Sequence, residues 1–88
     1  GEEFVVILPG ASLRNSVKKG KQICQAIAGT RYAIDERTQG DYLSITVSVG
    51  VSTLRRGDTV TQIIDRADRA LYHAKGTGKN KVVSEKQL

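Results

Sequence analysis

Four residue types are almost missing from this sequence of 88 residues. It contains one cysteine, one proline, no methionine and no tryptophan. A single cysteine, Cys24, excludes an intrachain disulfide and a cysteine-rich zinc site, and it is typical of a reducing compartment. Nothing near Cys24 in the sequence would activate a thiolate, so we interpret it as a packing residue. We therefore expect a cytoplasmic protein.

Long apolar runs are also missing. No uninterrupted apolar segment approaches the ~20 residues that span a bilayer, and the start Gly1-Glu2-Glu3 lacks the basic residues of a signal peptide. We expect no membrane contact by this segment. The net charge of +5, from 14 basic and 9 acidic residues, favours anionic partners. The basic residues are interleaved with acidic ones, which argues against a DNA-binding arm.

Regular patterns divide the first half of the chain into elements. Residues 4–8 form a continuous apolar run that predicts a strand covered on both faces. Ser12 can cap a helix that runs to about residue 28, where Gly29 supplies a stop. Residues 31–34 suggest a short strand before a polar turn at 35–40. From Leu43 to Val51 the apolar residues alternate strictly, which predicts the clearest strand.

The second half begins with a strong helix signal. Asp58 or Thr59 can cap the helix, and Thr59 with Gln62 can form a capping box. Gly76 and Gly78 would end it, and residues 81–83 predict a terminal strand. The apolar residues at helical spacing predict a buried stripe made of Val60, Ile63, Ile64, Ala67, Leu71 and Ala74. The order strand, helix, strand, helix, strand implies an α/β sandwich with one small core.

Three ordered blocks of sequence carry a resemblance to a known family. The start, GEEFVVILPG, resembles the signature loop and following strand of GGDEF domains in their GGEEF variant, beginning at the second glycine. SITVSVGVS at 44–52 is similar to the penultimate strand of that family, and ADRALYHAKGTGKNKV at 67–82 is similar to its final helix and loop. Together the blocks extend along the chain from residue 1 to residue 82.

The resemblance implies a fold, a reaction and partners. The fold would be a ferredoxin-like, nucleotidyl-cyclase-like sandwich, here a partial β-α-(β)β-α-β segment. Residues 1–88 would be the C-terminal part of a single GGDEF domain that starts inside the signature loop. The implied enzyme is a diguanylate cyclase, which condenses two GTP molecules into cyclic di-GMP with Mg²⁺ or Mn²⁺. Two domains would meet as a homodimer, and no nucleic acid would be bound.

The resemblance also implies specific roles for residues near the two ends of the chain. Glu2 and Glu3 match the acidic positions of the signature, which implies metal binding and, for Glu3, removal of a proton from the attacking hydroxyl. Gly1 would let the backbone pass close to the nucleotide, because it has no Cβ. Lys75 matches a lysine that contacts phosphate. Lys79 stands where the family usually has arginine, so it keeps the charge but loses the bidentate fork.

Other residues of the last block have simpler interpretations. We interpret Asp68 and Tyr72, one helical turn apart, as bracing the helix against the sheet. His73 lies off the apolar stripe and should be a surface residue. The GTGK sequence at 76–79 follows a helix instead of preceding one, so it is not a phosphate-binding P-loop. Asn80 should shape the loop.

Two other functions stay open at this point. A catalytically inactive member of the same family could bind GTP or cyclic di-GMP as a sensor, although Glu2 and Glu3 argue for an enzyme. An RNA-binding α/β module would fit the positive charge, but the low aromatic content of 5% leaves few rings for base stacking. The family residues that read guanine would precede this segment, so we expect the 88 residues alone to be inactive and unstable.

Overall fold

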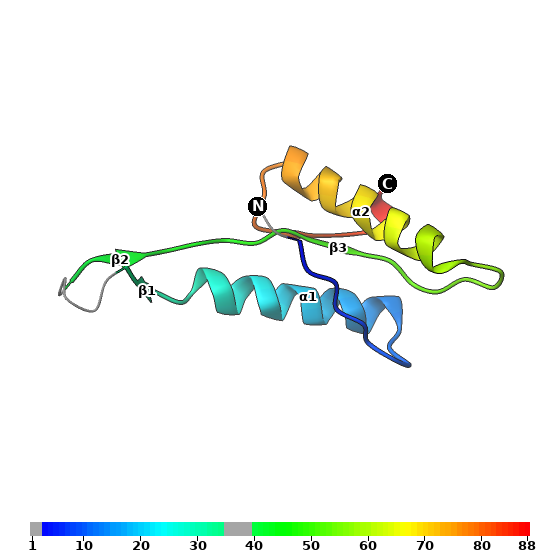
Figure 1. The fold of residues 1–88 in the computed structure, drawn as a ribbon, viewed down its shortest axis with the longest axis horizontal. Coiled ribbons are helices and arrows are strands. Elements are labelled where there is room, and N and C mark those ends of the chain that lie inside the picture. Colours follow the sequence, from blue (N-terminus) through cyan, green and yellow to red (C-terminus); the bar gives the residue numbers. More distant parts are fainter. Residues whose placement is uncertain (1–2, 35–39) are drawn as a thin grey trace.

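The computed structural model describes residues 3–34 and 40–88, and the statements below refer to them. The chain forms two helices, four short strands and one turn of 3-10 helix (Figure 1). In chain order these are α1 (Leu13–Ala28), β1 (Tyr32–Ala33), β2 (Tyr42–Leu43), β3 (Val49–Val51), α2 (Val60–Gly76), β4 (Val82–Ser84) and η1 (Glu85–Gln87).

A parallel strand pair lies between the two helices. β3 and β4 are paired in the register Val49 to Val82 and Val51 to Ser84. Figure 1 shows α2 on one side of this pair and α1 on the other, and both helices contact both strands. The expected α/β sandwich is therefore confirmed in partial form. The terminal strand predicted at 81–83 is confirmed with a shift of one residue.

A small antiparallel ribbon extends beyond the end of α1. In it, β1 pairs with β2 in the register Tyr32 to Leu43, which confirms the short strand predicted at 31–34. Figure 1 shows the ribbon well away from the strand pair between the helices. Most of the predicted polar turn, residues 35–39, lies outside the described residues.

Both helices begin at the residues predicted to cap them. The Ser12 hydroxyl accepts a hydrogen bond from the backbone N–H of Asn15 at 3.1 Å. Thr59 and Gln62 form the full capping box: the Thr59 hydroxyl accepts from the Gln62 N–H at 3.2 Å, and the Gln62 side chain accepts from the Thr59 N–H at 2.8 Å. Such caps satisfy N–H groups that have no partner within the helix.

Two glycines bring the helices close to the strands. A Cβ at Gly20 of α1 would lie 3.2 Å from the methyl groups of Val82. A Cβ at Gly50 of β3 would lie only 2.1 Å from the carbonyl oxygen of Ala67 in α2. The α2 backbone therefore rests directly on β3. The core is small, and its buried apolar residues are Cys24, Val51, Ala70, Ala74 and Val83.

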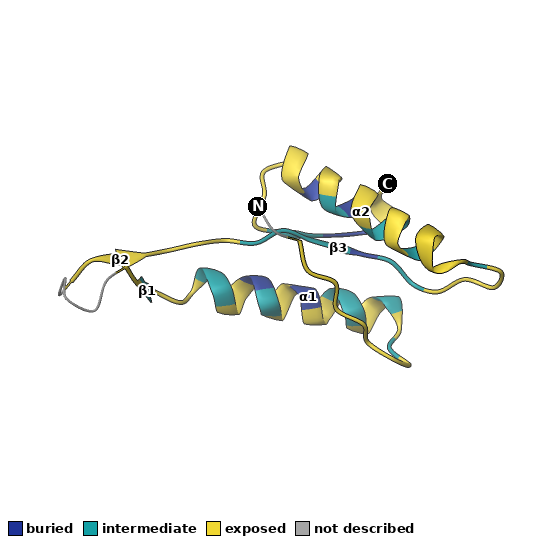
Figure 2. Ribbon diagram, viewed as in Figure 1, coloured by how far each residue is buried: buried dark blue, intermediate teal, exposed yellow. Residues whose placement is uncertain are grey.

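The prediction of a covered strand at residues 4–8 is wrong for this structure. The segment is extended, but neither of the described strand ladders includes it. Its side chains are exposed, with Phe4 at 84% and Ile7 at 81%, and Figure 2 shows the trace of this segment in the colour of exposed residues. An apolar run is buried only where other elements cover it, and here no strand pairs with it.

Two further expectations need correction. The strand predicted at 43–51 forms ladders only at its ends, and Leu43 and Ile45 remain exposed because no element covers that stretch. On α2 the predicted buried stripe includes Val60 and Ile64, which are exposed, and it omits Ala70, which is fully buried. The helix packs through its small residues because its backbone lies close to β3.

Among the helices of residues 3–34 and 40–88, neither the length nor the apolar content suffices to cross a membrane.

Candidate functional site

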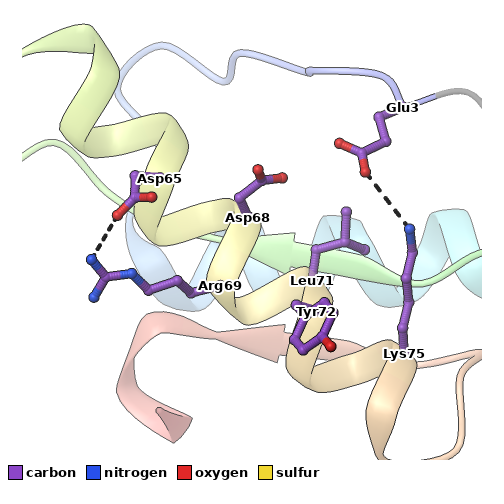
Figure 3. A pocket seen from close by; sticks show the side chains of 7 residues that line it. All are labelled: Glu3, Asp65, Asp68, Arg69, Leu71, Tyr72 and Lys75. Atoms are coloured by element: carbon purple, nitrogen blue, oxygen red, sulfur yellow. Dashed lines mark ion pairs between the residues drawn. The ribbon is translucent and has the colours of Figure 1, made fainter.

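The N-terminal segment and the end of α2 meet through opposite charges. The Lys75 ammonium nitrogen lies 3.7 Å from Oε1 of Glu3, and the two side chains are 49% and 59% exposed. Figure 3 shows Glu3 reaching from its extended segment toward Lys75 on the last turn of α2. The structure thus brings together two predicted site residues that are 72 positions apart in the sequence.

A shallow hollow of about 330 Å³ surrounds this ion pair. Figure 3 shows that one face of α2 forms its floor and that Glu3 lies across from it. The floor carries a further surface ion pair, in which Arg69 Nη2 lies 2.7 Å from Asp65 Oδ2. The lining residues are Glu3, Asp65, Asp68, Arg69, Leu71, Tyr72 and Lys75.

Three of the α2 residues that line the hollow share one helix face because of their spacing. Asp68, Tyr72 and Lys75 occupy positions i, i+4 and i+7, which lie on the same helix face. Tyr72 is 81% exposed, so its predicted role in bracing the helix is wrong in this structure. The same spacing, read together with Lys75, was the sequence signal that could have assigned Asp68 and Tyr72 to the site.

The loop after α2 has a conformation that only a few residues adopt readily. Lys79 and Asn80 both have positive φ, at 61° and 49°, and asparagine is enriched among residues that do so. The Lys79 N–H donates to the Ala74 carbonyl oxygen at 2.9 Å, which closes the end of α2. The expectation that Asn80 shapes this loop is confirmed. Lys79 does not line the hollow that holds Glu3 and Lys75.

The remaining predicted site residues have different outcomes. Gly1 and Glu2 lie outside the described residues, so their predicted roles stay predictions. His73 is exposed, as expected. Cys24 is buried, with its sulfur 3.5 Å from the Val47 carbonyl oxygen, and burial raises the pKa of its thiol. The interpretation of Cys24 as a packing residue is therefore confirmed.

The charges in the hollow are suited to a ligand that carries both signs. Exposed ion pairs contribute little stability because water screens them, so Glu3 and Lys75 can separate at small cost when a ligand enters. The oxygens of Glu3 and Asp68 are hard donors of the type that Mg²⁺ accepts. Within residues 3–34 and 40–88, no three metal-ligating side chains converge.

Fold and site together define a class of protein: an α/β sandwich in which Glu3 of the N-terminal segment faces Lys75 at the end of a helix. Comparison with known proteins narrows this class. The family model described as diguanylate cyclase, GGDEF domain, matches residues 1–81. The chain belongs to the GGDEF family.

Curated relatives agree with this assignment. The chain is 36% identical over 86 residues to the response regulator PleD of Caulobacter vibrioides, covering 97% of this chain and 18% of PleD. It is 37% identical over 81 residues to the diguanylate cyclase DgcZ of Escherichia coli, covering 92% of this chain and 26% of DgcZ. It is also 37% identical over 84 residues to the diguanylate cyclase VdcA of Vibrio cholerae, covering 94% of this chain and 24% of VdcA. The chain thus spans about a quarter or less of these relatives.

Proposed function

We propose that the natural protein containing these residues is a diguanylate cyclase that condenses two GTP molecules into cyclic di-GMP and releases two pyrophosphates. Two of the named relatives are diguanylate cyclases, and the GGDEF model covers nearly the whole chain. The single observation that supports the proposal most directly is the ion pair of Glu3 with Lys75 beside an open hollow.

The proposed chemistry is nucleotidyl transfer between two bound nucleotides. The 3′ hydroxyl oxygen of one GTP attacks the α-phosphorus of the other, and the bond from that phosphorus to the β-phosphate oxygen breaks. The proton leaves the attacking hydroxyl, and pyrophosphate carries away the electrons of the broken bond. A second transfer in the opposite direction closes the ring. Most of the rate enhancement in such a reaction comes from alignment and charge stabilisation.

Each site residue has a stated part in this proposal. Glu3 would accept the proton of the attacking hydroxyl or hold a divalent ion, and Glu2 would help to hold that ion. Lys75 offsets the negative charge of the phosphates, and Lys79 in the following loop contributes a second positive charge. Gly1 leaves room for the nucleotide. Bound Mg²⁺ or Mn²⁺ would neutralise charge on the triphosphate, the usual role of divalent ions in this chemistry.

The reaction requires two copies of the site. One domain holds one GTP, so a homodimer must place two nucleotides face to face. We propose a cytoplasmic location, because GTP is a cytoplasmic substrate and Cys24 is a free thiol.

Product formation by the full-length natural protein tests the proposal. Incubation with GTP and Mg²⁺ should give cyclic di-GMP and pyrophosphate, separated by chromatography. Glu3→Gln keeps the size of the side chain and removes its charge, and it should lower the rate by on the order of 10²-fold or more, as expected for a general base. Asp41→Asn is the matched control, since Asp41 lies exposed on the ribbon away from the hollow, and its rate should be unchanged.

Two results would contradict the enzyme assignment. If the unmodified protein binds GTP or cyclic di-GMP and forms no product, the sensor interpretation replaces it. If Glu3→Gln forms product as fast as the unmodified protein, the assigned role of Glu3 is wrong.

A further inference from the structure

Arg66 makes most of the side-chain hydrogen bonds that attach the first half of α2 to its surroundings. Arg66 Nε lies 3.0 Å from Glu85 Oε2, Nη1 lies 3.0 Å from Asp58 Oδ1, and Nη2 donates to the Thr53 carbonyl oxygen at 2.9 Å. Arg66 also pairs with the second oxygen of Asp58. One guanidinium therefore joins the loop before α2, the helix itself and η1 after β4.

The two carboxylates around Arg66 have further partners. Glu85 accepts a hydrogen bond from the Thr53 hydroxyl at 2.6 Å and lies 3.2 Å from Arg55 Nη2. Asp58 accepts from the Arg55 backbone N–H at 2.6 Å. The side chains of Arg66, Asp58 and Glu85 are only 17%, 9% and 5% exposed. We call these five residues, Thr53, Arg55, Asp58, Arg66 and Glu85, the Arg66 clamp.

The electrostatics of the clamp agree with its geometry. The hydrogen bond from Arg66 lowers the pKa of Asp58 to about 2, with help from the Arg55 N–H. The same bond raises the pKa of Arg66. Burial raises the pKa of Glu85, but the Thr53 hydrogen bond and the charges of Arg55 and Arg66 outweigh burial and leave this pKa below its usual value. All three groups are therefore charged at neutral pH.

Besides Arg66, the Ser52 hydroxyl holds α2 through a single hydrogen bond, which it donates to the Ile63 carbonyl oxygen at 2.8 Å. The remaining contacts set the distance of α2 from the strands. Its buried residues are Ala70 and Ala74, whose methyl groups make non-directional contacts. The Gly50 contact with Ala67 and Leu71 limits how closely α2 approaches β3. The fork of Arg66 is directional, because a guanidinium presents its donors in one plane. Together with the Ser52 hydrogen bond, it restrains both the rotation of α2 about its axis and its axial position.

That position determines where Lys75 lies. Lys75 follows Arg66 by nine positions, or about 13.5 Å along the axis at 1.5 Å per residue. A small rotation or shift of the helix would move Lys75 away from Glu3, since their contact already spans 3.7 Å.

We propose that Arg66 is a positioning residue for the nucleotide site: the Arg66 clamp holds α2 in the rotation and axial position that place Lys75 opposite Glu3. This inference rests on the proposed function for its kinetic effect. Arg66 itself does not line the hollow, so it acts through Lys75.

Kinetics of the full-length natural protein test the coupling. Arg66→Gln should lower kcat/KM for GTP by about tenfold or more, because a misplacement of about 1 Å can cost on the order of 10²-fold. Arg66→Lys keeps the charge without the fork and should recover part of the loss. Arg56→Gln, the same substitution at an exposed neighbour with no ion pair among the described residues, should have no effect. In a Lys75→Gln background, Arg66→Gln should cause little further loss.

A distance measurement tests the placement without using activity. Pulsed electron paramagnetic resonance can measure the distance between the helices. One spin label is attached at Lys18→Cys in α1 and the other at His73→Cys in α2, and both positions are exposed. The protein should carry Cys24→Ser and no other cysteine. Arg66→Gln should shift or broaden the distance distribution, and Arg56→Gln should leave it unchanged. If Arg66→Gln does not fold, Glu85→Gln removes only the charge and takes its place.

The outcomes separate the two proposals. An unmodified protein that makes no cyclic di-GMP defeats the proposed function, while a shifted distance in Arg66→Gln still supports the clamp. Full product formation with an unchanged distance distribution in Arg66→Gln overturns the positioning role and leaves the cyclase assignment standing. Equal losses from Arg66→Gln with and without Lys75→Gln also overturn it, because Arg66 would then not act through Lys75.

Discussion

The strand pair β3–β4 and the N-terminal segment contain similar apolar residues, but only those of the strand pair are buried. Val51 and Val83 are buried between the helices, whereas Val5 and Val6 are exposed on an extended segment. The composition of the two regions does not explain this contrast. β3 and β4 have each other and two helices as neighbours, while residues 4–8 have no strand partner in the described chain. Burial is thus decided by available neighbours, and hydrophobicity alone does not produce it.

Substitution of Gly50 should have the largest effect on the stability of the covered strand pair. In Gly50→Ala the new methyl group would lie 2.1 Å from the Ala67 carbonyl oxygen, so α2 must move away from β3. We expect the free energy of unfolding to fall by about 3 kcal/mol, the upper part of the usual range for overpacking. Urea unfolding of the natural protein, followed by circular dichroism, measures this change.

Gly76→Ala is the control for Gly50→Ala. Gly76 is the last residue of α2, and a Cβ there would meet no atom within 4 Å. The added methyl should be neutral or should stabilise the helix by up to about 1 kcal/mol. A Gly50→Ala protein as stable as the unmodified one would show that α2 does not rest on the β3 backbone.

A pair of valine truncations tests the contrast between the two regions directly. Val83 is 3% exposed and Val5 is 70% exposed. Val83→Ala should lower the free energy of unfolding by about 2 kcal/mol through lost burial and a residual cavity. Val5→Ala should change it by less than about 0.5 kcal/mol, as surface substitutions usually do. Equal losses, measured by the same unfolding experiment, would show that another element of the natural protein covers residues 4–8.

The features predicted most closely from sequence are those with local causes. The caps at Ser12 and Thr59 depend on neighbours within three residues, and helical periodicity needs no distant partner. The strand at 4–8 failed because its burial depends on contacts from elsewhere. The close contact of Gly50 with α2 was also missed, since a glycine within an alternating strand gives no sign of which element approaches it.

The candidate site was predictable to a similar degree. Glu3 and Lys75 are far apart in the chain, and only the family resemblance joined them before the structure did. Asp68 and Tyr72 were predicted to brace α2 against the sheet, but they line the hollow on the exposed face of the helix. The Arg66 clamp could not be predicted, because its members at positions 53, 55, 58, 66 and 85 follow no helical or strand period and meet only after β3, α2 and β4 have packed.

Acid should weaken the covered region through the clamp and have less effect on the ribbon. The folded-state pKa of Asp58, about 2, is below the unfolded value of about 3.9, and the pKa of Glu85 is also lowered. As the pH falls, the unfolded chain therefore takes up protons first, so the stabilisation is complete above about pH 5 and is lost progressively toward pH 2. Asp58→Asn should unfold at a lower temperature than the unmodified protein at neutral pH, and it should lose less stability on acidification. The control is Asp41→Asn, because Asp41 lies on the ribbon and takes part in no described ion pair. This control should behave as the unmodified protein does. Melting temperatures between pH 7 and pH 3 measure this difference, and parallel curves for Asp58→Asn and the unmodified protein would show that the clamp does not form.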